Sequence, residues 1–364
     1  MSETTISTNG QVIKFLSEFA REWNRTNRLS PYAGKGYMNV ISQKVDAGPT
    51  VRHSLVTRLK GSGVSGSDEL RGKGEAIGNY TWDTNPTYYR HAVEFNKEDL
   101  EKTNLALMGE ARPLLLQWLK SATRDRQIQA MGAIYNGTTY ANLDSATAAQ
   151  RNTWLVNNKA RTQFGAYSSG GSAGGAVLAT DLGEIDGTND KFTYTQLRRL
   201  RLLAEDSDPH ITPYQSNEQG EVYVVFAGSV AMRDFRASLD TINQNADVRG
   251  MKITSNGNAL ARDGDLFFEG TIIRKVPEIT TNFSSTGKFL ATAGASSVVV
   301  EPVFLCGMQA LSHGMKSAPM IEVDRTYDYG FRPGVAIEVK EDVKKTFFND
   351  IQHGIVSGFF SGVK

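Results

Sequence analysis

The sequence has only one cysteine, Cys306, among its 364 residues. A single thiol forms no intrachain disulfide, and no zinc site can be built from cysteines alone. The neighbours of Cys306 in the stretch VFLCGM are apolar, so we expect a buried structural thiol and not a nucleophile. The five histidines also lack metal-ligand spacing, since none lies three to five residues from another. The sequence therefore predicts no metal site.

An excess of charge of either sign is also missing. Lys and Arg total 40 against 39 Asp and Glu, which leaves a net charge of +1. A near-neutral chain lacks the basic surface with which proteins grip DNA or RNA along their length. No run reaches the ~18 apolar residues of a membrane-spanning helix. The first ten residues, MSETTISTNG, are polar, so we expect neither a secretory signal nor a membrane partner.

What the sequence does contain is a set of segments that are hard to bury within one subunit. Residues 10–25 place apolar side chains three and four positions apart, which predicts an amphipathic helix in an N-terminal arm. Phe15, Phe19 and Trp23 lie on its apolar stripe. We expect this stripe to dock either on the subunit's own core or on a neighbouring subunit.

Residues 49–96 are expected to form a long hairpin. Residues 51–59 and 88–95 alternate with period two, and His53 and His91 would face each other as a cross-strand pair in preference to a two-histidine metal site. The segment 61–74 between them has five glycines and contains the pattern G-x-G-x-x-G. No buried strand precedes that pattern and no apolar helix follows it, so we do not expect a nucleotide site. The segment cannot pack a core and predicts a mobile charged tip that needs a partner surface.

Residues 97–136 carry a helical pattern in which Pro113 should kink the helix or split it in two. Residues 137–190 are expected to be the loosest part of the chain, with loop and turn signals. Further along, the pattern of apolar residues predicts helices over 194–205 and 229–239 and a buried strand over 221–228. It then predicts a turn and strands over 258–276, and a strand followed by a helix over 298–315. The last predicted elements are closing strands over 335–340, 345–348 and 353–360. The layout is that of an α+β fold.

No catalytic constellation is visible in the sequence. Neither a P-loop nor a G-x-S-x-G elbow occurs, and we expect no cofactor. Acidic pairs at 206/208 and 263/265 flank glycine or proline, which turn capping explains better than a cation site; an enzyme of unknown class with a carboxylate site around Asp206, Asp263 and Asp265 remains the alternative. The basic runs 198–201 and 344–345 are expected on solvated helix faces. The arm, the hairpin and the long helix suit subunits that clasp one another.

Five stretches carry a resemblance to a known family, in the family's own order. They are GPTVRHSLVTRLKGSGVSGSDELRGKGEAI at 48–77, EVYVVFAGSVAMRDF at 221–235, NALARDGDLFFEGTIIRKVPEI at 258–279, FLCGMQALSHGMK at 304–316 and DYGFRPGVAIEVKEDVKKTFF at 328–348. With them the chain resembles the major capsid protein of tailed bacteriophages, and within that class the coliphage N-four type.

The resemblance implies the tailed-phage major capsid fold, in which the segment 304–316 would be a helix. It implies an N-terminal arm at 1–48, an extended hairpin loop at 49–96, a spine helix at 97–136, a peripheral domain at 137–220, an axial domain at 221–300 and a return to the peripheral domain at 301–364.

In function, the resemblance implies a non-enzymatic subunit that self-assembles through pentamers and hexamers into an icosahedral shell around the viral genome. The virion capsid would be its location and the host cytoplasm its place of assembly. Portal, scaffold and decoration proteins would be partners, and double-stranded DNA would be enclosed without strong specific binding. The hairpin tip would make intersubunit contacts through Lys60, Asp68, Glu69, Arg71, Lys73 and Glu75.

Overall fold

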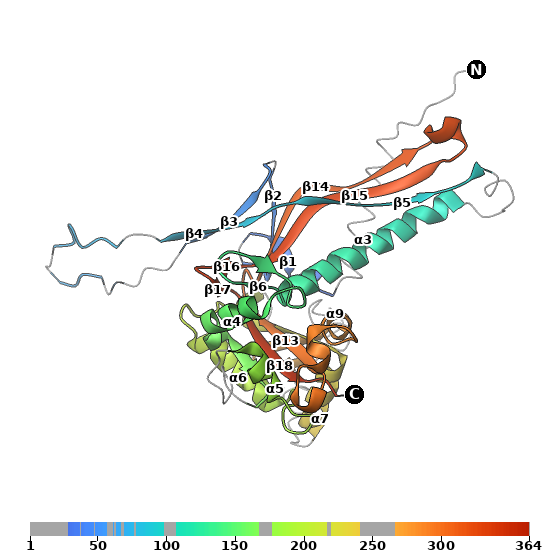
Figure 1. Ribbon diagram of the computed structural model, residues 1–364. Coiled ribbons are helices and arrows are strands. Elements are labelled where there is room, and N and C mark those ends of the chain that lie inside the picture. The colour runs from blue at the N-terminus through green and yellow to red at the C-terminus, as the bar shows by residue number, and fades with distance from the viewer. Residues whose placement is uncertain are drawn as a thin grey trace, which may run out of the picture.

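The structure is a computed structural model in which a long, thin sheet extends from a compact α/β part (Figure 1). It describes residues 28–36, 38–46, 48–56, 61, 63–66, 69–75, 78–97, 107–166, 177–216, 220–240 and 266–363. The N-terminal stripe of Phe15, Phe19 and Trp23 lies outside the described residues.

The long part is a five-stranded sheet with helix α3 (Leu107–Met131) packed on one face. Every second residue of its strand Gly334–Lys345 is buried, from Val335 to Lys345, as expected of a strand with one covered face. Leu115 and Leu119 of α3 pack on Val335, Ile337 and Val339. The strand order is β1 (Ala33–Lys35), β2 (Ile41–Val45), β14 (Leu311–Asp324), β15 (Gly334–Lys345) and β5 (Thr87–Glu94).

Helix α3 is a single helix from Leu107 to Met131, so the expectation that Pro113 splits it is wrong. A bend at this proline stays a prediction. The helix also ends earlier than the predicted residue 136. Ile134 and Tyr135 instead form strand β6 (Ile134–Tyr135), which pairs with β7 (Tyr140–Ala141).

The predicted hairpin exists, but with a different second strand. Strand β3 (Val51–Val56) pairs antiparallel with β4 (Asn79–Thr84), whereas residues 87–94 form β5 and pair with β15. Asn85 and Pro86 separate β4 from β5, and proline cannot donate to a strand ladder. The expected pair of His53 and His91 is therefore wrong. His53 lies opposite Trp82, and His91 stacks on Trp118 of α3 with ring centroids 4.7 Å apart.

The compact part is built on a seven-stranded sheet. Its helices are α4 (Ala148–Asn157), α5 (Leu178–Gly183), α6 (Tyr194–Asp206), α7 (Ser229–Asp240) and α9 (Glu278–Phe283). Its strands follow the order β11 (Leu266–Phe268), β12 (Thr271–Lys275), β10 (Gly220–Ala227), β13 (Val300–Cys306), β18 (Ile355–Ser361) and β8 (Thr162–Phe164), with β9 (Tyr214–Ser216) beside β10.

Several predictions for this part are confirmed. The predicted helices over 194–205 and 229–239 are α6 and α7, and the predicted buried strand is β10. The closing strands correspond to β15, β18 and the short pair β16 (Phe347–Phe348) and β17 (Ile351–Gln352).

Residues 137–190 hold more structure than expected. A capping box at Thr147 and Gln150 begins α4, and Trp154 and Leu155 of that helix are buried.

The helix expected within residues 304–316 is wrong, because β13 continues to Cys306 and β14 begins at Leu311. Gln309 has a φ of 51°, which turns the chain out of β13, and β14 then runs from Leu311 to Asp324. Its first residues are buried on both faces, so no alternation marks them as a strand. The remaining turns are the 3-10 segments Ser30–Tyr32, Lys159–Arg161, Phe289–Thr292, Ala295–Ser297 and Tyr327–Gly330.

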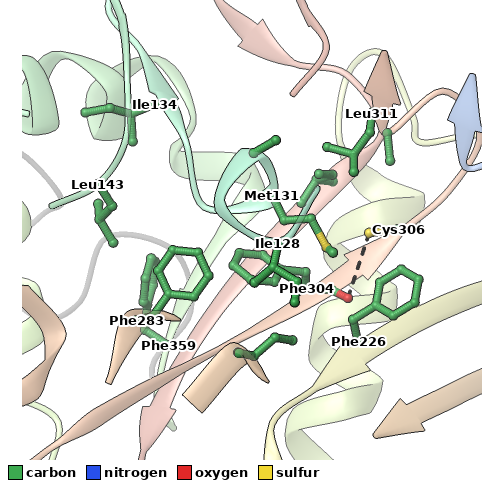
Figure 2. Packing of buried hydrophobic residues seen from close by; sticks show 14 of the residues in the cluster. Ile128, Met131, Ile134, Leu143, Phe226, Phe283, Phe304, Cys306, Leu311 and Phe359 are labelled. Atoms are coloured by element: carbon green, nitrogen blue, oxygen red, sulfur yellow. Dashed lines mark hydrogen bonds between the residues drawn. The ribbon is translucent and has the colours of Figure 1, made fainter. Parts of the chain in front are cut away.

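One apolar cluster joins the long sheet to the compact part (Figure 2). Ile128 and Met131 at the end of α3 enter it beside Phe304 of β13. Cys306 lies in the same cluster and is 1% exposed, with its Sγ 4.0 Å from the Phe304 carbonyl oxygen. Burial raises the pKa of this thiol, and the expected structural cysteine is confirmed.

Candidate assembly surfaces

The β3–β4 hairpin projects sideways from the end of the long sheet, away from helix α3 (Figure 1). Its strands pair in register from Val51 opposite Thr84 to Val56 opposite Asn79. Arg52 donates from Nε and Nη2 to the two Asp83 carboxylate oxygens, at 2.9 Å each. This bidentate bond lowers the pKa of Asp83. Because the Arg52 side chain is exposed and that of Asp83 is only half-buried, the pair fixes strand register more than it stabilises the subunit.

The base of the hairpin is anchored in the core. Trp82 packs against the rings of Tyr135, Tyr140 and Phe347, with centroids 5.3 to 6.2 Å apart. Its cross-strand neighbour His53 is 3% exposed. The hairpin therefore leaves the subunit from a fixed root.

The tip contrasts with this root. Glu69, Arg71, Lys73 and Glu75 are exposed, and Leu70 keeps 67% of its surface open to solvent. Glu75 accepts a hydrogen bond from the Gly61 backbone N–H at 2.7 Å, which closes the neck of the loop. Lys60 and Asp68 lie outside the described residues. An apolar side chain that is open in one subunit is a contact available to another.

A second exposed tip joins β14 to β15, and the sequence analysis did not predict it as a contact surface. Tyr327, Tyr329 and Phe331 are exposed by 58%, 106% and 40%. Asp328 and Tyr329 have φ values of 51° and 53°, an uncommon conformation for residues with a Cβ atom. The only signal in the sequence was the spacing of three aromatic residues around Gly330.

The long sheet and α3 are locked together by a buried group of charges. Glu341 of β15 accepts hydrogen bonds from His313 Nε2 at 2.9 Å and from Thr123 Oγ1 at 2.6 Å, and it forms an ion pair with Arg126. Burial alone would raise the pKa of Glu341, but these partners lower it to about 2. Sequence reasoning missed this group because its members lie up to 218 residues apart.

The described residues hold only part of the carboxylate group expected for the enzyme alternative. Within these ranges no three His, Cys, Asp or Glu side chains are grouped so that they could hold a metal ion. Asp206 is the exposed last residue of α6, and Asp263 and Asp265 lie outside the described residues. None of the described helices is long and apolar enough to cross a membrane.

Of the two basic runs, only one lies on a solvated helix face. Arg198 and Arg199 are exposed on α6, as predicted. Lys345 lies in strand β15 and is 1% exposed, so the expectation for 344–345 is wrong. The alternation of β15 directs its side chain inward, where Nζ lies 3.4 Å from Ser357 Oγ and 5.4 Å from the Trp154 ring centroid.

Comparison with known proteins gives a consistent result. The family model described as phage capsid protein matches residues 3–358, whereas no curated protein matches. The chain is similar to the capsid subunit of cyanophage Pam1, with 31% identity, 93% of each chain covered and a TM-score of 0.78. It is also similar in fold to the capsid of Ralstonia phage GP4, with 21% identity, 92% and 90% coverage and a TM-score of 0.70. The head of Helicobacter pylori bacteriophage KHP40 shares the fold at 11% identity, with 93% and 91% coverage and a TM-score of 0.64.

Proposed function

This chain belongs to the phage capsid protein family, and on that premise we propose how its surfaces build a shell. It has the tailed-phage major capsid fold and is a structural subunit of the icosahedral capsid. Family and fold are those of a structural, non-enzymatic protein, and the carboxylate alternative around Asp206 has no support among the described residues. The observation that carries this function is the family match over residues 3–358, together with the Pam1 likeness over 93% of the chain.

The finer assignment that we propose is a major capsid protein of the coliphage N-four type. Copies of the chain would associate into pentamers and hexamers in the host cytoplasm and close into the shell around double-stranded DNA. Portal, scaffold and decoration proteins would be its further partners. The net charge of +1 suits a wall that encloses DNA without gripping it. We keep the proposed domain boundaries at 48, 220 and 300, and we place the end of the hairpin at Thr84 and the end of the spine helix at Met131 in place of residues 96 and 136.

We propose that the hairpin tip is the clasp between neighbouring subunits. Lys60, Asp68, Glu69, Arg71, Lys73 and Glu75 would contact a neighbour. Phe15, Phe19 and Trp23 of the arm would dock on the subunit's own core or on a neighbour. The support is the contrast between a root packed on Trp82 and a tip whose Leu70 is open to solvent. Ordering such a tip costs roughly 1–2 kcal/mol of backbone entropy per residue, which contacts with a neighbour can offset.

Deletion of Gly61–Gly74 tests this clasp. The shortened subunit should stay soluble, keep a near-native circular dichroism spectrum and yield few closed particles in negative-stain electron micrographs. The Arg71→Ala variant should lower particle yield, whereas Arg199→Ala, an equally exposed arginine on α6, should not. Normal shells from the deletion variant would exclude the hairpin as the clasp. If the full-length chain stayed a compact monomer at high concentration, shell assembly itself would be wrong.

A further inference from the structure

Strand β5 forms one edge of the five-stranded sheet. Its odd-numbered residues bond to β15: the ladder continues into the bonds from Phe95 N–H to Pro333 O and from Lys97 N–H to Phe331 O, at 2.9 and 3.0 Å. Backbone groups alternate in direction along an antiparallel strand. The N–H and C=O groups of Tyr88, Arg90, Ala92 and Glu94 therefore point away from β15, and no described strand pairs with them.

The two faces of this edge strand differ. Tyr89 lies under the Arg126 guanidinium, with 3.8 Å from Cζ to the ring centroid, and His91 stacks on Trp118, so the odd-numbered residues face α3. The side chains of Tyr88, Arg90, Ala92 and Glu94 are exposed on the opposite face. Within the described part of the chain, neither Arg90 nor Glu94 has an ion-pair partner. Strand β5 is eight residues long, and the backbone groups along its outer edge can pair with another strand.

We propose that β5 pairs antiparallel with β5 of a second copy of this chain, about a two-fold axis at Ala92, so that two five-stranded sheets become one. The Arg90 of each copy then lies opposite the Glu94 of the other copy, and the two Ala92 residues lie opposite each other. This inference rests on the proposed shell assembly, which supplies the second copy. It concerns a contact separate from the hairpin clasp.

The charges select this register. An axis at Arg90 or at Glu94 would place like charges directly opposite each other, which is destabilising. An axis at His91 or Val93 would place both charges opposite neutral residues. Charged edge residues also protect monomers from pairing, but here the two signs are spaced so that a second copy satisfies both of them. The edge is therefore self-complementary, as a two-fold interface requires.

Disulfide trapping tests the pairing in assembled particles. In the hydrogen-bonded register the two Ala92 Cα atoms would lie about 5.5 Å apart, within the range that a disulfide spans. Ala92→Cys should therefore give a band at twice the subunit mass after mild oxidation and non-reducing electrophoresis. The native Cys306 is buried and stays in every variant.

Ala336→Cys is the matched control. Ala336 lies beside Ala92 on β15, one strand further from the edge. Its Cα atoms in the two copies would be roughly 14 Å apart, too far to bridge. If particles form and Ala92→Cys gives no more dimer than Ala336→Cys, the edge pairing is wrong while the shell function stands. If the chain forms no particles at all, the proposed shell function is wrong, and the edge pairing that rests on it is wrong as well.

Charge reversal in the Ala92→Cys background tests the register. Arg90→Glu or Glu94→Arg alone should lower the dimer yield about tenfold, because two like-charge contacts replace two opposite-charge ones. The double variant Arg90→Glu/Glu94→Arg should restore it. Equal yields from the single and double variants would overturn the register centred on Ala92.

Discussion

His313 Nε2 lies 2.9 Å from Glu341 Oε2, and both side chains are buried where α3 crosses the long sheet. The other carboxylate oxygen accepts the Thr123 hydroxyl at 2.6 Å and pairs with Arg126. Three elements, α3, β14 and β15, thus share one carboxylate. A buried charge with this many donors holds its neighbours in a single arrangement, and it is costly to disturb.

Replacement of Glu341 by Gln is therefore expected to destabilise the subunit by about 3–5 kcal/mol, because the Arg126 charge loses its buried partner. Denaturant unfolding of purified subunits measures the change. Glu338→Gln, on the solvent side of the same strand, is the control and should shift stability by less than about 0.5 kcal/mol. Similar midpoints for the two variants would show that the Glu341 group does not hold α3 on the sheet.

The hairpin root should respond to acid through His53. Burial, followed by the nearby Lys44 and His313 charges, lowers the pKa of His53 from 6.5 to about 4, and Asp83 opposes this only in part. The unfolded imidazole takes up a proton near pH 6.5 and the folded one only near pH 4, so stability is lost as the pH falls from 6.5 to 4. The expected loss from this group is a few kcal/mol.

Thermal unfolding of His53→Gln across pH 4 to 7 checks this expectation. The variant should lose less stability on acidification than the wild-type subunit, and His91→Gln, on the exposed edge strand, should follow the wild type. Burial also lowers the pKa of His353 to about 4. His353 is present in all three proteins, so it adds the same dependence of stability on pH to each of them. Equal slopes for His53→Gln and the wild type would refute the assignment to His53.

Lys345 carries a buried amine, which we expect to lower the stability of the subunit near neutral pH. Burial lowers its pKa to about 7. The unfolded amine stays charged up to pH 10.5, so stability falls as the pH drops from 10.5 towards 7. We expect Lys345→Met to raise the melting temperature by several degrees near pH 7 and by little above pH 10.5. Lys344→Met, the half-buried neighbour, is the control without this gain. A lower melting temperature for Lys345→Met would instead show that the amine is required where it contacts Trp154.

For Lys345, the sequence predicts the strand but not the surroundings of the side chain. Period-two alternation over 335–340 predicted a strand, and its continuation places Lys345 on the inner face. The buried amine of Lys345 lies against Ser357 and against Trp154 of α4, and these two residues are too far from it in the sequence for a local pattern to predict the contact. Local pattern sufficed for α6, whose buried residues recur with helical spacing, and for β10, whose apolar run is buried from Val222 to Ala227.

The local sequence pattern could not predict which strands pair with each other. Residues 88–95 were correctly expected to be a strand, but the assignment to the hairpin failed because β5 bonds to β15, more than 200 residues away. The exposed charged tip of the hairpin could be predicted from its glycines. The position of β5 at the edge of the sheet could not be predicted before the order of the strands was known. Strand type is a local property, and strand order is not.

Gly228 is expected to tolerate no side chain. It precedes α7, where the buried Glu301 carboxylate accepts the Ala231 N–H at 2.7 Å. A Cβ atom at Gly228 would collide with this carboxylate and lie 2.7 Å from Thr280 Oγ1. We expect Gly228→Ala to cost about 3 kcal/mol, because the displaced carboxylate no longer caps the helix. Gly183→Ala, which meets no atom within 4 Å, is the control and should change stability by at most about 1 kcal/mol. Denaturant midpoints compare the two, and coincident curves would show that Glu301 moves aside without loss.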